Sequence, residues 1–125
     1  MAGKVYICAL SHARQVPKDN NNLFLTTRSK RNSNGIYHFP GLAPSQELFN
    51  KYHQVWKGNP PELWWYAYRE QYLRELQQPY IDYLRTGLDA NQNITLMCFC
   101  RDETHCHRSL LKEIFANLGY ETTSL

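Results

Sequence analysis

The sequence predicts a small Rossmann-like α/β fold, with helices packed on a mostly parallel sheet. Short apolar runs rich in β-branched residues stand near the N-terminus, and a helical middle part follows them. A nearly continuous apolar run at residues 94–100 then precedes a last helix. The 125 residues fit one α/β domain spanning residues 1–125.

The first strands are expected at residues 4–10 and 23–27. Val5 and Ile7 give the first run its β-branched character, and a polar loop at residues 15–22 separates the two runs. A further extended segment is expected at residues 36–39, after a turn signal.

Three helices are expected next. Ser45 is the predicted N-cap of the first, and residues 58–61 (Gly-Asn-Pro-Pro) end it. Pro79 is expected to kink or break the helical stretch, and the apolar stripe continues after it. Their predicted apolar faces comprise Leu48, Phe49, Tyr52 and Val55, then Trp65, Tyr68, Tyr72 and Leu76, then Tyr80, Ile81, Leu84 and Leu88.

The last part of the chain reads as strand, short loop and helix. The strand at residues 94–100 is expected to be buried on both faces. Thr104 or Asp102 is the predicted cap of the last helix, which ends at Gly119. Its predicted core face consists of Leu110, Leu111, Ile114, Phe115 and Leu118.

If the strands are parallel, the segments that follow them meet at one edge of the sheet, where such folds bind ligands. These segments are residues 11–14, 28–31 and 101–108, and they carry much of the basic charge. The candidate ligand-binding residues outside the last segment are therefore Ser11, His12, Thr27 and Arg28.

Composition excludes several classes. The net charge of +3 is well below that of a DNA-coating protein, and no apolar run is long enough to span a membrane. Three of the four cysteines lie within nine residues, whereas a secreted disulfide scaffold would distribute them. We therefore expect a cytoplasmic protein that has free thiols, a metal or a reactive site.

The segment from Cys98 to Arg108 contains the unusual chemistry. We expect Cys106, His107 and Arg108 in the first turn of the last helix, where backbone N–H groups and the helix dipole favour a thiolate or an anion. One interpretation makes Cys106 a nucleophile, His107 its acid or base and Arg108 an anion clamp. In that interpretation Cys98 is a third candidate catalytic residue, and Cys100 and Arg101 are further candidate ligand-binding residues.

Two other interpretations of this segment remain open. Zinc could be held by Cys98 or Cys100 together with Cys106 and either His105 or His107, although the spacing matches no usual zinc knuckle. Alternatively, the cysteines are small buried residues in a tight strand–helix joint. We expect no bound cofactor, with zinc as the one alternative.

The residues 96–100, Leu-Met-Cys-Phe-Cys, followed by Cys106-His107-Arg108 and a leucine-rich helix, resemble the C-terminal signature of the domain-of-unknown-function 488 family (DUF488). Upstream similarity is fainter, at residues 25–29, at residues 42–45 and in the aromatic helix. The resemblance implies a Rossmann-like fold of bacterial and phage proteins, nucleotide- or nucleic-acid-related work, and a site at Cys98, Cys106, His107 and Arg108. Many relatives have an acidic residue near the position of Cys100.

Two functional hypotheses result. The first is a nucleotide- or nucleic-acid-directed protein that binds an anionic, phosphate-bearing ligand at the Cys98–Arg108 segment. The second is a non-catalytic interaction factor, such as a phage-type inhibitor of a host or defence protein, that uses the aromatic helix and the basic loop. The aromatic helix is also the expected surface for a protein partner or a homodimer. A cluster that opens to a pocket would favour the first hypothesis, and a sealed one the second.

Overall fold

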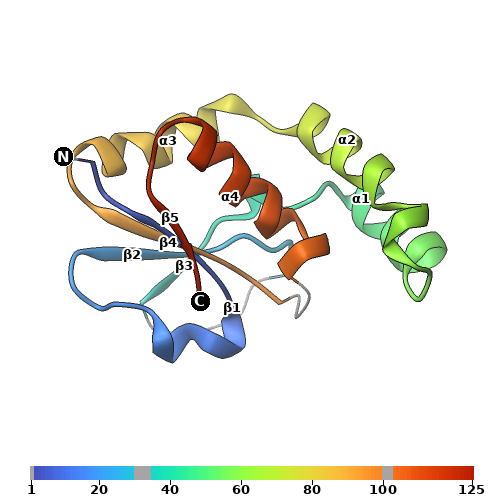
Figure 1. The fold of residues 1–125 in the computed structure, drawn as a ribbon, viewed down its shortest axis with the longest axis horizontal. Helices are drawn as coiled ribbons and strands as arrows, with labels where there is room; N and C mark the ends of the chain where they lie inside the picture. The colour runs from blue at the N-terminus through green and yellow to red at the C-terminus, as the bar shows by residue number, and fades with distance from the viewer. Residues whose placement is uncertain (1, 30–34, 100–102) are drawn as a thin grey trace.

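A computed structural model describes residues 2–29, 35–99 and 103–125. Its centre is a five-stranded sheet in the order β3-β2-β4-β1-β5, in which all pairs are parallel (Figure 1). The strands are β1 (Val5–Ala9), β2 (Asn21–Leu25), β3 (Ile36–His38), β4 (Asn93–Cys98) and β5 (Thr122–Ser124). The predicted Rossmann-like α/β fold is thus confirmed.

β4 is the central strand of the sheet, between β2 and β1. β4 pairs with β1 from Ile94 opposite Val5 to Cys98 opposite Ala9, and its other side pairs with β2. Every residue of β4 after Asn93 is buried, which agrees with the expected burial on both faces.

The helices are α1 (Gln46–Lys51), α2 (Trp65–Glu75), α3 (Gln78–Asp89) and α4 (His107–Asn117). α3 and α4 lie on one side of the sheet (Figure 1), and α2 contacts α4 and α1. The 3-10 segment Leu10–Gln15, which follows β1, lies on the opposite side (Figure 1). No helix among the described residues is both long and apolar enough to cross a bilayer.

Local sequence signals account for the helix ends. The backbone N–H of Leu48 donates to Ser45 Oγ at 3.1 Å, which confirms the predicted N-cap of α1. Pro79 stands in the first turn of α3, where a missing N–H costs nothing, so the predicted break is also correct. Gly119 adopts a φ of 95° immediately after α4, a conformation that glycine accepts without strain.

Several element predictions were wrong. The predicted cap of α4 was Thr104 or Asp102, but the N-cap is Cys106. Thr104 lies in an earlier 3-10 turn, where its Oγ1 is hydrogen-bonded to His105 Nδ1 at 3.0 Å. Asp102 lies outside the described residues. Cys106 therefore precedes the first turn of the helix instead of belonging to it.

The apolar face of the first helix is also shorter than predicted. α1 continues into a π-helical turn, Tyr52–Trp56, whose wider spacing shifts the following side chains around the axis. Val55 is consequently 57% exposed, while Leu48 is fully buried. Leu118, predicted as core, is exposed at the end of α4.

The topology creates a switch point between β2 and β4. The chain leaves β2 toward β3 at one edge of the sheet, and it leaves β4 through α4 toward β5 at the other edge. The carboxyl ends of these neighbouring strands flank the crevice where open parallel sheets bind ligands. Thr26 and Thr27 follow β2 at this point, and Cys98 ends β4.

Candidate functional site

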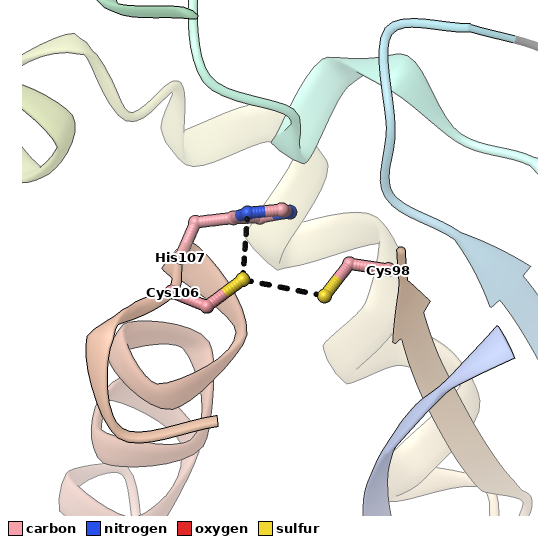
Figure 2. A group of neighbouring side chains, drawn as sticks. All are labelled: Cys98, Cys106 and His107. Carbon is pink, nitrogen blue, oxygen red and sulfur yellow. Dashed lines mark hydrogen bonds between the residues drawn. The ribbon is translucent and has the colours of Figure 1, made fainter. Parts of the chain in front are cut away.

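Three side chains meet at the carboxyl end of β4, and we call them the thiol cluster: Cys98, Cys106 and His107 (Figure 2). Cys98 Sγ lies 3.3 Å from Cys106 Sγ, and Cys106 Sγ lies 3.5 Å from His107 Nδ1. One donor atom from each residue lies within 4.8 Å of the others. All three residues are buried.

The start of α4 holds two members of the cluster in place. Cys106 has extended backbone angles, φ −141° and ψ 154°, as an N-cap residue requires. Its carbonyl accepts hydrogen bonds from Ser109 N at 3.0 Å and from Ser109 Oγ at 2.8 Å. These bonds fix the first turn, so that His107 projects back over the sheet toward β2.

His107 is oriented by the segment that follows β2. Its Nε2 lies 2.7 Å from the carbonyl oxygen of Thr26 and 3.2 Å from Thr26 Oγ1, which itself donates to Met97 O at 2.9 Å. A carbonyl only accepts, so we assign the proton of the neutral ring to Nε2. The lone pair of Nδ1 then faces the sulfur of Cys106. This is the arrangement of a nucleophile, its base and a group that orients the base.

The surroundings of the cluster are mostly apolar. The ring of Tyr72 lies 5.8 Å from that of His107, and its hydroxyl donates to Leu42 O at 2.7 Å. Burial raises the pKa of Tyr72 well above its usual value, and negative charge on Cys106 and Cys98 raises it further. Tyr72 therefore stays neutral beside the cluster.

Arg108 is buried, which is unusual for an arginine. It is only 3% exposed, and its Nε has no hydrogen-bond partner. Among the described residues no carboxylate forms an ion pair with it. It stands in the first turn of α4, but it does not line the pocket described next.

The thiol cluster lines a cavity of about 630 Å³. The described lining is strongly aromatic, with Phe49, Tyr52, Trp64, Tyr68 and Phe99, and it includes two cations, Arg28 and Lys57. Arg28 is held by Pro44 O at 3.2 Å and by Gln46 Oε1 at 3.1 Å, which ties the loop after β2 to α1. The cavity thus lies at the switch point, between the carboxyl ends of β2 and β4.

The structure brings together only part of the predicted set. Thr27 and Arg28 line the cavity along with the thiol cluster. Ser11 and His12 are exposed in the segment Leu10–Gln15 and do not line it. Cys100 and Arg101 lie outside the described residues.

Sequence reasoning missed Thr26 and Lys57. It favoured core packing for the aromatic helix over base stacking, and it expected the exposed rings to form a partner surface. For Thr26, a usable signal is its position as a hydroxyl residue immediately after a buried strand. The π-helical turn that carries Tyr52 toward the cavity has no comparable signal in the sequence.

The cluster also has the donor types of a zinc site, with two cysteines and one histidine. The Nε2–H of His107 donates to Thr26 O, so Nδ1 is the ring nitrogen that could bind the metal. Two thiolates bound tetrahedrally at about 2.3 Å stand roughly 3.8 Å apart. The observed sulfur–sulfur distance of 3.3 Å is shorter. His105 lies instead with its ring 5.3 Å from Trp65.

A family model for the DUF488-N3a group, described as the active DUF488-N3 subclade, matches residues 5–119. The chain belongs to the DUF488 family. No curated protein and no solved structure matches it significantly. The match extends over nearly the whole DUF488 chain, from β1 to the end of α4, and so it includes the upstream segments whose resemblance was faint.

Cys8 provides an internal reference for the thiol cluster of this DUF488 protein. It is 1% exposed and packs with Val16, Leu25 and Met97. Burial raises its pKa from 9.0 to about 11, and the charge of Arg108 opposes this shift.

The raised pKa of Cys8 predicts a loss of stability at alkaline pH. The unfolded thiol ionises near pH 9.0 and the folded thiol only near pH 11, so the contribution is complete below pH 9.0 and falls as the pH rises toward 11. The Cys8→Ala variant should lack this dependence, with a difference of up to about 2 kcal/mol. Urea unfolding of both proteins at pH 8 and pH 10.5 tests it, and parallel losses would contradict it.

Proposed function

We propose that the protein is a thiol-dependent enzyme that acts on a nucleotide, either free or within a nucleic acid. One observation carries the proposal. The Cys106–His107 pair, with its base oriented by Thr26, lies in a cavity at the switch point that is lined by aromatic rings and cations.

The geometry supports a specific first step. Cys106 transfers its thiol proton to His107 Nδ1, and the resulting thiolate attacks an electrophilic carbon of the ligand. The imidazolium keeps its Nε2–H bond to Thr26 O and returns the Nδ1 proton to the leaving group. The N-terminal end of α4 stabilises the thiolate, because the helix dipole is positive there.

The cavity lining supports a nucleotide as the ligand. Aromatic side chains stack on nucleobases irrespective of sequence, and cations contact phosphate. Arg28 and Lys57 supply positive charge in the lining, and Phe49 and Phe99 are each 40% exposed, so part of each side chain is open to a ligand.

The alternative function, a non-catalytic interaction factor, predicted that the cluster would be sealed in the core. The cluster instead lines the cavity, which favours a ligand site. Tyr66 on α2 and Leu63 just before this helix are exposed, but an exposed pair of side chains does not identify a partner.

Calorimetric titration with nucleoside monophosphates tests the function. The Phe49→Ala variant should bind the best of them about 5- to 100-fold more weakly, since stacking on one base contributes roughly 1–3 kcal/mol. Tyr66→Ala is the matched control, because this exposed aromatic residue lies outside the cavity lining. Absence of binding by the wild-type protein to both nucleotides and single-stranded oligonucleotides would overturn the proposal.

A further inference from the structure

We infer that Cys98 and Cys106 form a dithiol–disulfide couple that is oxidised by a hydroperoxide and thereby blocks the site. The inference rests on the proposed function only in that Cys106 is the reactive thiol. It assigns to Cys98 a role that nucleophilic catalysis by Cys106 does not need.

The positions of the two sulfur atoms carry this inference. They lie 3.3 Å apart, and a disulfide bond of about 2.05 Å needs them to approach by little more than 1 Å. The last residue of β4 and the N-cap of α4 hold them side by side, with both side chains directed toward each other (Figure 2). A relaxed pair of zinc-bound thiolates would need the sulfur atoms to move apart by about 0.5 Å, so a metal assay belongs to the test of this couple.

The third described cysteine does not compete for this bond. Cys8 belongs to a separate cluster with Val16, Leu25 and Met97, and its raised pKa keeps it a thiol. Within the described residues, Cys98 and Cys106 therefore form the pair that can close, and Cys8 serves as a control.

The chemistry balances with a hydroperoxide as the oxidant. The Cys106 thiolate, whose proton is on His107 Nδ1, attacks the hydroperoxide oxygen, and the O–O bond breaks to give a sulfenic acid and water or an alcohol. The Cys98 sulfur then attacks Cys106 Sγ, the S–OH bond breaks, and a second water leaves with the Cys98 proton. The two thiols lose two electrons and the peroxide gains them.

The cavity provides the route for a small oxidant, because both cysteines contribute to its lining although each is buried as a residue. The Cys98–Cys106 disulfide leaves no free thiol at Cys106. A nucleotide bound in the cavity should shield both cysteines from the oxidant, so that oxidation and ligand binding compete.

Peroxide oxidation of the reduced full-length protein tests the inference. A slight excess of hydrogen peroxide should remove two hydrogens from the intact mass, and peptide mapping should place the bond between Cys98 and Cys106. The loss should reverse with dithiothreitol. In Cys98→Ser the product should instead be a sulfenic acid that dimedone traps, whereas Cys8→Ser and Cys100→Ser should behave as wild type.

Three results would overturn the couple. The first is a disulfide that maps to Cys100, and the second is a Cys106 that iodoacetamide alkylates rapidly but peroxide does not convert to a disulfide. The third is one tightly bound zinc per chain that the Cys98→Ser variant loses. The second result leaves the proposed nucleophile intact. Conversely, a mapped Cys98–Cys106 bond in a protein that binds no nucleotide would overturn the proposed ligand and keep the couple. Mapping on the wild-type protein makes the test independent of whether the variants fold.

Discussion

His107→Gln is expected to slow the alkylation of Cys106 by iodoacetamide at pH 7 by roughly 10- to 20-fold. An ordinary free thiol is only a few per cent ionised at this pH, whereas a thiol paired with a base is largely thiolate. His107 Nδ1 faces Cys106 Sγ at 3.5 Å, because the Nε2–H is bonded to Thr26 O. The glutamine amide can keep the bond to Thr26 O but provides no base.

The pH profile separates loss of the base from a packing defect. Above about pH 9.5 most thiols are ionised without help, so the rates of the wild-type and variant proteins should converge there. A constant ratio at all pH values would show that the variant merely closes access to Cys106. Alkylation at the site is followed by peptide mass analysis, with Cys8 as the internal reference because its raised pKa keeps it unreactive at pH 7.

The sheet could be predicted from the sequence because its central strands carry strong local signals. β4 is a nearly unbroken apolar run and β1 is rich in β-branched residues, so tertiary contacts reinforce what the residues already favour. β5 was missed because its three polar residues, Thr122–Ser124, form a strand only by pairing with β1. Such an element depends on a partner 117 residues earlier in the chain, from Thr122 to Val5, and a local pattern does not reveal it.

The candidate site likewise contains residues that the sequence could place and residues that it could not. Parallel strands place Cys98 and the residues after β2 at one edge, so the expected meeting of Thr27 and Arg28 with Cys98 and Cys106 needed only the period and direction of the strands. The expected contribution of Ser11 and His12 used the same reasoning, but the chain after β1 turns into the segment Leu10–Gln15 and leaves both residues exposed. Direction of a strand predicts the edge of the sheet, and the following turn decides whether a residue reaches the site.

Arg108→Met is expected to make the ligand-free protein more stable, by about 1–3 kcal/mol in urea unfolding. A guanidinium that is 3% exposed loses most of its hydration, and its Nε has no hydrogen-bond partner. No carboxylate among the described residues compensates the charge. An unbranched apolar side chain in this space removes the desolvation cost and keeps much of the packing.

The same substitution should impair the site. The charge of Arg108 opposes the rise that burial causes in the Cys8 pKa, and Arg108 is next to His107 in the first turn of α4, so its charge should also favour a thiolate at Cys106. Without it, Cys106 should be alkylated about 3- to 10-fold more slowly at pH 7. Arg108→Lys, which keeps the charge, should retain most of the reactivity. A less stable Arg108→Met protein with unchanged thiol reactivity would mean that the arginine is a packing residue. A more stable protein whose Cys106 reacts more slowly would mean that the fold carries an uncompensated charge because the site needs it.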